Sequence, residues 1–369
     1  MIEKKRFVKK LQDFRLLPVF VIVSMAIGIL IGKLYGISNY ELTPPIEAIK
    51  SIFNGTYQFN LPNTLAIGIV LGLFLMMYPC MTNVRINDLS KAFRSRKQLA
   101  IVFFFNFAIA PFWMLILANS FLQSGSDLHT GLILYGLAPC IAMVIVFTFL
   151  AQGNNALALV LVAINSIMQM IFIPVYAYLL LGRVGFDVLV VGESVILYLG
   201  LPLLAGFLTR KYGVQKWGEE KFENIREYLH SLAIVGLLFT LIVMFALKGD
   251  LILDRPDLII KMAIPMTIFF WSMFAVVYLV SRKMKLTYED AVACAFNSTG
   301  RDFEIAIAIA ITAFNPTVAL ATVVGPLIEV PVMLVLVAFA KRTCYWFKEC
   351  KLDLPYCKCF EGRAAEKIA

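Results

Sequence analysis

Apolar runs of about twenty residues recur along almost the whole chain, and this recurrence constrains the fold more than any other feature. One run of this length crosses the ~30 Å hydrocarbon core of a bilayer as an α-helix. Sixty per cent of the residues are apolar and only 15% are charged, which separates the chain from ordinary soluble domains. Because backbone groups in lipid must pair internally, the predicted elements are helices.

Ten runs are candidate membrane-spanning segments. They predict a transmembrane domain over residues 17–342, between an N-terminal segment at 1–16 and a Cys-rich tail at 343–369. The predicted spans are 17–36, 62–81, 98–121, 130–151, 156–181, 188–208, 229–248, 259–281, 288–313 and 317–340.

Lys and Arg concentrate in alternate connections. The N-terminal segment, the 82–97, 209–228 and 282–287 connections and the tail are basic, whereas the four intervening connections are poor in Lys and Arg. By the positive-inside rule, both termini are predicted to be cytoplasmic in a multi-pass protein of the cell membrane. The net charge of +9 therefore indicates membrane topology and no nucleic-acid partner.

Two predicted spans are interrupted. Span four contains Gly136-Leu137-Ala138-Pro139-Cys140, and span nine contains the polar sequence Asn297-Ser298-Thr299-Gly300-Arg301-Asp302. Pro removes a backbone donor and Gly weakens a helix. Polar backbone and charge at membrane depth are tolerated only against protein or a cavity. Both helices are therefore predicted to be broken.

The two interrupted regions match at an offset of 160, which aligns Cys140 with Gly300 and Asn155 with Asn315. Five spans in each half, at about 17–181 and 188–340, would give the halves opposite orientations. The predicted fold is thus all-α, with ten transmembrane helices in a five-plus-five inverted repeat and broken helices four and nine. Secondary transporters of this kind bind solutes at the midplane, between the discontinuous helices.

Glu329 is the strongest single candidate for function, because it lies mid-span among apolar residues. A carboxylate at that depth is costly and is usually functional. It is the predicted proton carrier, with a structural ion pair or hydrogen bond as the alternative.

Arg301, Asp302 and Glu304 follow the second break. Arg301 is predicted either to meet the solute or to form an ion pair with Asp302, Glu304 or Glu329. A structural salt-bridge cluster is the alternative role for this group.

Cys140 lies at the first break, where a thiol beside a helix end can bind soft elements. The alternative is that Cys140 is a small buried apolar residue. Three amide side chains are candidate ligands of a solute or bridges between helices: Asn106, Asn165 and Gln169. The polar residues Asn297, Ser298 and Thr299 of the second break are candidate ligands of an ion.

The tail carries Cys344, Cys350, Cys357 and Cys359, whose spacing matches no standard zinc pattern. The sequence has no P-loop and no HExxH motif. We therefore predict a transporter without a cofactor or a resident metal, and no enzyme. A membrane-embedded sensor or enzyme has only the tail in its favour.

Several segments resemble arsenite efflux permeases, which belong with the bile acid/sodium symporters in one ten-helix superfamily. The stretches are MMYPCMTNVRINDLSKAFRSRKQL, LAPCIAMVIVFTFLAQGNNALALVLVAINSIMQMIFIPVYAYLLL, GRDFEIAIAIAI and VVGPLIEVPVMLVLV. The resemblance runs from about residue 15 to 342. It implies export of arsenite in exchange for protons, with Cys140 as the essential thiol and Glu329 as the essential carboxylate.

This chain departs from the permease pattern at the breaks. The family usually has Arg immediately before the Cys, where this chain has Pro139, and a pair of Asn where it has Arg301-Asp302. We hypothesise that Arg301 supplies the relocated positive charge. The alternative function is sodium-coupled symport of an organic anion. The oxygen-bearing side chains from Asn297 to Glu304 would then hold sodium, and Arg301 would meet the anion.

Overall fold

The computed structural model describes residues 17–37, 51–52, 54, 60–82, 95–141, 143–182, 188–254, 256–314, 318–319, 322 and 324–347. In this part of the chain the architecture is helical, with one isolated antiparallel bridge. The predicted all-α class is confirmed. The 82–97 connection, the N-terminal segment and the tail lie largely or wholly outside the described residues.

The first half of the chain contains α2 (Leu17–Tyr35), α4 (Leu61–Met81), α6 (Arg96–Phe103), the π-helix η2 (Phe104–Ile109), α7 (Ala110–Phe121), α8 (Asp127–Leu137), α9 (Met143–Leu150) and α10 (Asn155–Leu181). The second half contains α11 (Val188–Val195), the π-helix η4 (Ile196–Gly200), α12 (Leu201–Asp254), α13 (Pro256–Lys283), α14 (Tyr288–Thr299), α15 (Phe303–Ala313), α17 (Gly325–Arg342) and the short 3₁₀ turn η5 (Cys344–Trp346).

Four helices are long and apolar enough to cross a membrane: Arg96–Phe121, Asn155–Leu181, Leu189–Gly218 and Ile259–Lys283. Three shorter apolar helices are Ile22–Tyr35, Ile67–Pro79 and Ser231–Val243. The chain is thus a membrane-embedded protein, whereas the number of ten spans stays a prediction. Both predicted interruptions are present, since α8 and α9 divide the fourth predicted span and α14 and α15 divide the ninth.

The 209–228 segment, which the sequence analysis treats as a connection, is helical. It belongs to α12, whose backbone leaves helical geometry at Gly218, with φ 79° and ψ 162°. Glycine adopts a positive φ without a steric penalty, so the chain can change direction there with almost no loop. Lys and Arg in this segment therefore lie on helical turns.

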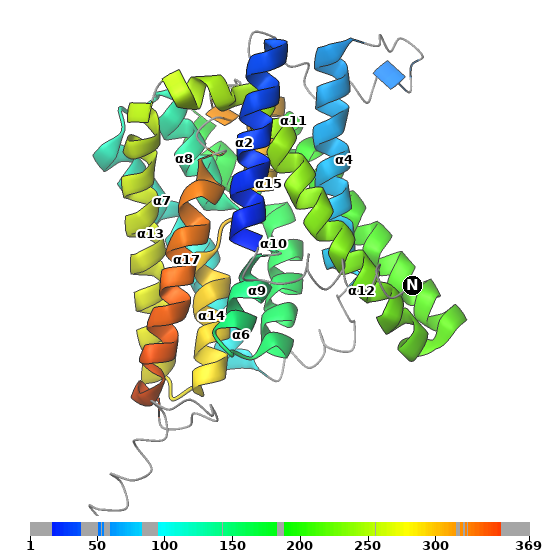
Figure 1. Ribbon diagram of the computed structural model, residues 1–369. Helices are drawn as coiled ribbons and strands as arrows, with labels where there is room; N and C mark the ends of the chain where they lie inside the picture. Colours follow the sequence, from blue (N-terminus) through cyan, green and yellow to red (C-terminus); the bar gives the residue numbers. More distant parts are fainter. Residues whose placement is uncertain are drawn as a thin grey trace, which may run out of the picture.

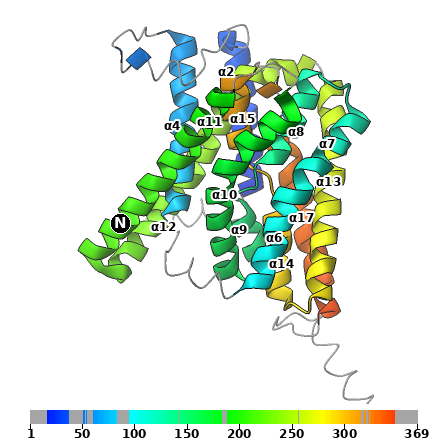
Figure 2. The same cartoon turned by 180° about the vertical axis from the view of Figure 1, so that it is seen from behind.

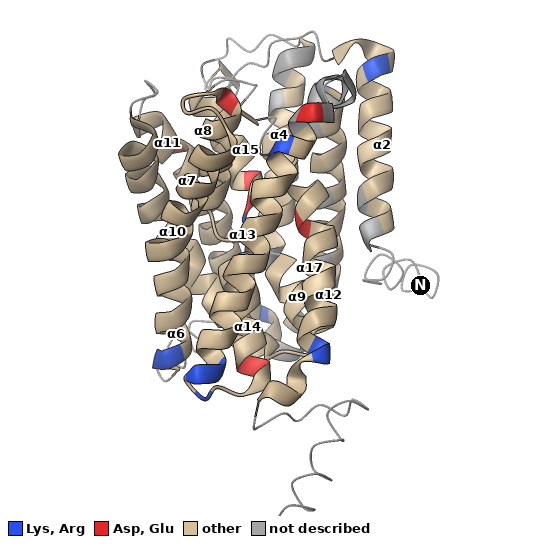
Figure 3. Ribbon diagram, turned by 90° about the vertical axis from the view of Figure 1, so that its left-hand side faces the viewer, with Lys and Arg blue, Asp and Glu red and all other residues tan. Residues whose placement is uncertain are grey.

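The helices form two groups (Figure 1). In one group, α2 and α4 pack on α12, which leans away from the rest; the other contains α6 to α10 and α13 to α17. The reverse view shows the same separation of α4 and α12 from the larger group (Figure 2). Most charged residues lie at the ends of the helices and few lie midway (Figure 3). That distribution suits a hydrocarbon layer around the middle.

Glycines allow unusually close packing in the smaller group. A Cβ at Gly32 of α2 would lie 2.3 Å from the Ala246 carbonyl oxygen of α12, and one at Gly236 of α12 would lie 2.8 Å from the Met76 nitrogen of α4. The backbones are therefore nearly in contact, as at small-residue interfaces of membrane helices.

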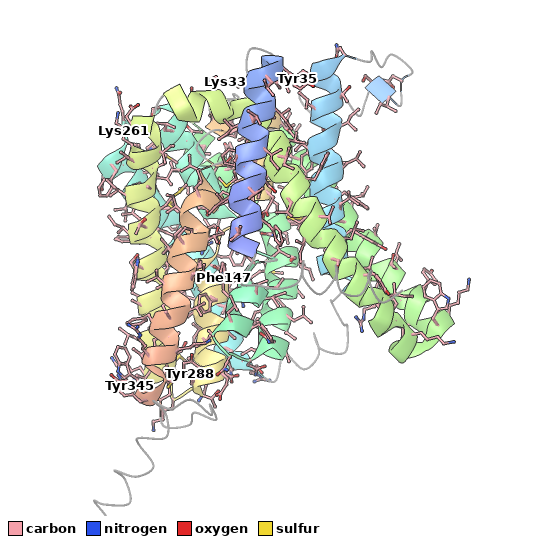
Figure 4. The ribbon with its side chains drawn as sticks, in the orientation of Figure 1. Lys33, Tyr35, Phe147, Lys261, Tyr288 and Tyr345 are labelled. Atoms are coloured by element: carbon pink, nitrogen blue, oxygen red, sulfur yellow. The ribbon has the colours of Figure 1, made fainter. Side chains whose placement is uncertain are left out.

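Side chains mark the two ends of the bundle (Figure 4). Lys33, Tyr35 and Lys261 lie at one end, Tyr288 and Tyr345 lie at the other, and Phe147 of α9 lies between them. Because α14 starts at Tyr288 and stops at Thr299, it ends inside the bundle. The second interruption is therefore internal.

Candidate functional site

The two interrupted helices meet at their interruptions. The segment between α8 and α9 runs antiparallel to the segment between α14 and α15. The Cys140 N–H donates to the Gly300 carbonyl at 3.0 Å, and the Asp302 N–H donates to the Ala138 carbonyl at 2.8 Å. Backbone groups that the helix breaks would leave unpaired are thus paired with each other. We call this joint the crossing.

Pro139 and Arg301 face each other between those two hydrogen bonds. An antiparallel pair in this position needs neither of its own N–H groups for the ladder. Proline, which has no N–H, is therefore compatible with the crossing. The Arg301 N–H is left available and donates to Oε1 of Glu329 at 3.3 Å.

Glu329 lies on α17 and is buried beside the crossing, with 2% of its surface exposed. Its second oxygen, Oε2, accepts a hydrogen bond from the Tyr135 hydroxyl at 2.7 Å. Each carboxyl oxygen therefore has a donor, one from the crossing and one from α8. This arrangement suits a carboxylate that must exist in a buried setting.

The Arg301 side chain is fully buried and points back into the protein. It donates to the carbonyls of Gly136 at 3.4 Å and Ser298 at 2.5 Å, and to Oδ1 of Asn106 at 2.9 Å. Its Cζ lies 5.1 Å from the centre of the Phe269 ring. Gly136 and Ser298 lie in the last turns of α8 and α14, so one guanidinium meets the negative ends of both helix dipoles.

The expected ion pair between Arg301 and a carboxylate is not what the structure contains. Among the described residues the guanidinium donates to carbonyl and amide oxygens, and Glu329 is reached through the backbone N–H of Arg301. Asp302 instead caps α15 by accepting from the Ile305 N–H at 3.1 Å. Glu304, in the first turn of α15, is buried. The guanidinium pairs with helix-end carbonyls because both breaks leave unpaired carbonyls that point toward it.

Gly300 lies between the thiol-bearing and the carboxyl-bearing elements. A Cβ there would be 3.1 Å from Cβ of Cys140, 3.4 Å from Oε1 of Glu329 and 2.5 Å from Cγ1 of Val144. The Cys140 thiol is free and buried. The absence of a side chain at Gly300 therefore lets Cys140 and Glu329 approach the same point beside one backbone segment.

Four of the predicted polar residues have buried atoms without a protein partner. These atoms are Nδ2 of Asn165, both amide atoms of Gln169, Oδ1 of Asn297 and Oγ of Ser298. Buried polar groups are normally satisfied by protein, water or ligand. These atoms are therefore available to a polar solute or an ion.

Asn106 and Thr299, in contrast, are occupied within the protein. Asn106 donates to the Asn297 carbonyl at 3.0 Å while it accepts from Arg301, and the Thr299 hydroxyl donates to the Ala295 carbonyl at 2.7 Å. Asn106 lies on the π-helix η2, and such bulges often occur at functional sites. The contact of Asn106 with α14 matches its alternative role as a bridge between helices, whereas the Thr299 hydrogen bond lies within α14.

Tyr135 is a site residue that the sequence analysis does not identify. The signal was present, because tyrosine in membrane helices favours the interfaces and this one precedes an internal break by a few residues. What the sequence does not give is the contact between Tyr135 on α8 and Glu329 on α17.

The model of the sodium bile acid symporter family matches residues 58–255. An uncharacterized transporter of Synechocystis sp. is 36% identical over 357 residues, covering 90% of this chain and 89% of that protein.

Two further relatives are arsenical-resistance proteins named Acr3. The protein from Alkaliphilus metalliredigens is 35% identical over 353 residues, which covers 91% of this chain and 94% of the relative. The protein from Corynebacterium glutamicum is 32% identical over 336 residues, with 87% and 86% covered. The family model matches more than half of the chain, and the relatives extend over nearly all of it, so the chain belongs to the sodium bile acid symporter family.

Proposed function

We propose that this protein is a secondary transporter that exports arsenite from the cell in exchange for protons. The observation that carries the proposal is that Cys140 and the Glu329 carboxyl both lie within 3.4 Å of the position that a Cβ at Gly300 would occupy, at the crossing of two interrupted helices. Similarity to two proteins named for arsenical resistance supports the choice of solute.

The chemistry of the crossing suits this solute. Arsenite is neutral near pH 7, carries hydroxyl groups and reacts reversibly with thiols. Cys140 would bind the arsenic, which is a soft element. The amides of Asn165 and Gln169, and the oxygens of Asn297 and Ser298, have unused hydrogen-bonding atoms that suit its hydroxyl groups. Glu329 would take up a proton when the solute leaves.

The proposed architecture is ten spans in two inverted repeats, with both termini in the cytoplasm and the protein in the plasma membrane. The antiparallel pairing of the two breaks supports two halves of opposite direction. The tail from 343 is proposed to be cytoplasmic. Sodium-coupled symport of an organic anion is not favoured, because the relatives named for a solute are named for arsenicals.

Arsenite accumulation in cells that lack their own arsenic efflux tests the proposal. We expect the parent protein to lower accumulation, and Cys140→Ser and Glu329→Gln to abolish that effect. Cys294→Ser is the matched control, because Cys294 is also free and fully buried but lies on α14 near Gln98.

Proteoliposomes with an imposed pH gradient separate the two couplings. Arsenite movement that follows the proton gradient in the absence of sodium supports exchange for protons. If the parent protein does not lower accumulation in cells, the proposed solute is wrong; if only a sodium gradient drives movement, the proposed coupling is wrong.

A further inference from the structure

Tyr135 occupies a closely fitted position on α8. Its side chain is fully buried and packs edge-on against Phe270, with ring centres 6.4 Å apart. A Cβ at Gly325 would lie 2.7 Å from the ring carbon Cε2 of Tyr135 and 3.3 Å from its hydroxyl oxygen. Only glycine at position 325 therefore leaves room for the phenol.

Gly325 and Glu329 are one helical turn apart on α17 and so share a face of that helix. The Tyr135 ring lies over Gly325, and its hydroxyl reaches Oε2 of Glu329 at 2.7 Å. Among the described residues, Glu329 is the recorded hydrogen-bond partner of this hydroxyl. The fit of the ring thus determines where the hydroxyl points.

Other ionisable groups also act on the Glu329 carboxyl, but differently. Arg301 approaches it through its backbone N–H, while its guanidinium contacts helix ends. The remaining ionisable groups around Glu329 come from the first break, the second break and α15, and all three are buried: Cys140, Asp302 and Glu304. Tyr135 is the side chain that donates a hydrogen bond to it.

We propose that Tyr135 is a positioning residue that holds the Glu329 carboxyl beside Gly300 and sets the pH range in which Glu329 exchanges its proton. This inference rests on the proposed function, in which Glu329 carries the proton. A phenol can donate to the ionised carboxylate and, after rotation of its O–H, accept from the protonated acid. The pair therefore stays together in both states, and Glu329, not Tyr135, is the group that gains and loses the proton.

Infrared spectroscopy of the purified protein tests this role without any solute. The carbonyl band of the protonated Glu329 is identified by its loss in Glu329→Gln and is followed as the pH is varied. In Tyr135→Phe the ionised carboxylate loses a donor, so the band should persist to a pH about one to two units higher than in the parent.

Two further variants complete the test. Tyr278→Phe is the matched control, since it also removes a buried phenol hydroxyl, one that contacts Thr343; its band should titrate as in the parent. Gly325→Ala keeps the hydroxyl but displaces the ring, and it should shift the titration in the same direction as Tyr135→Phe. Unchanged titration in both Tyr135→Phe and Gly325→Ala would overturn the inference.

Transport measurements on the same variants keep the two proposals separate. If the parent exports no arsenite but the Glu329 titration shifts in Tyr135→Phe, the proposed solute fails and the positioning role stands. If the parent exports arsenite and the titration does not shift, the positioning role fails and the proposed function stands. If both hold, the pH profile of transport shifts in Tyr135→Phe and not in Tyr278→Phe.

Discussion

The two helix interruptions pair with each other as antiparallel backbone segments but carry different side chains. The first presents Pro139 and the free thiol of Cys140, without a charged group, whereas the second presents Arg301 and Asp302. Nevertheless, the single guanidinium contacts the last turns of both helices, through the carbonyls of Gly136 and Ser298. The breaks are therefore not independent, since the second supplies the positive charge that both helix ends need.

This asymmetry has a chemical consequence. Because the cation comes from the second break, the first break can present a free thiol next to Gly300 without a charged side chain of its own. The second break supplies the stabilising side-chain contacts: Arg301 donates to the ends of α8 and α14, and Asp302 caps α15. Substitutions in the second break should consequently be the more damaging to stability.

The largest effect is expected from Arg301→Met. It leaves the carbonyls of Gly136 and Ser298 and the amide of Asn106 without their donor, and breaking a buried charge network typically costs about 3–5 kcal/mol. Thermal unfolding of the purified protein should show a large loss of stability. The stability of Arg301→Lys should lie between that of Arg301→Met and that of the parent, since an ammonium cannot reach three acceptors as the planar guanidinium does. Equal stability of Arg301→Met and the parent would show that the breaks do not share the charge.

Moving the cation to the other break sharpens the comparison. If the charge matters more than its position, Pro139→Arg should restore part of the stability and transport lost in Arg301→Asn. The single variant Pro139→Arg places two cations at the crossing. It should therefore be less stable than the double variant that combines Pro139→Arg with Arg301→Asn. Transport that survives in Arg301→Asn, together with no rescuing or additive effect of Pro139→Arg, would refute the relocated charge.

An intermediate effect is expected from Gly300→Ala. The added methyl would meet Val144 at 2.5 Å and Cys140 at 3.1 Å, and overpacking of this kind costs about 1–3 kcal/mol. It should also separate Cys140 from Glu329 and reduce arsenite export. Gly192→Ala is the control, because nothing lies within 4 Å of a Cβ at Gly192. Thermal unfolding and cell accumulation assays should show a larger loss of stability and of arsenite export in Gly300→Ala than in Gly192→Ala.

The smallest effect is expected at Asp302, where the two possible roles can be separated. Asp302→Ala removes the cap of α15 and should cost about 1 kcal/mol, whereas Asp302→Asn keeps a capping oxygen and should leave stability nearly unchanged. If Asp302→Asn nonetheless abolishes transport, the carboxylate has a role beyond the cap, in binding an ion or a proton. Unfolding and transport must therefore be measured on the same preparations.

Much of the helical architecture could be predicted from residue order alone. The interruptions follow from Pro139, Gly300 and the polar hexapeptide, because those residues cannot continue a helix in lipid without compensation. Glu329 could be identified for the same reason, as a carboxylate at mid-span. These predictions depend on local composition, which a sequence displays directly.

The contacts of the site could not be predicted. Charge alone favours pairing Arg301 with Asp302, Glu304 or Glu329, but the position of two helix ends decides the outcome, and that depends on how α8 and α14 cross. Tyr135 was missed because its partner is 194 residues away in the chain. The helical 209–228 segment was also missed, since its charges suggest a loop while the turn needs only Gly218.

The crossing is made by main-chain atoms that flank positions 139 and 301, and this has a consequence for how such proteins diversify. A substitution at position 139 changes a side chain at the proposed solute site but removes none of the hydrogen bonds that join the two breaks. The residue at this position can therefore vary without loss of the hydrogen bonds that form the crossing. A library of all residues at position 139 should yield many well-folded proteins with altered solute selectivity, which makes this position a natural starting point for directed evolution.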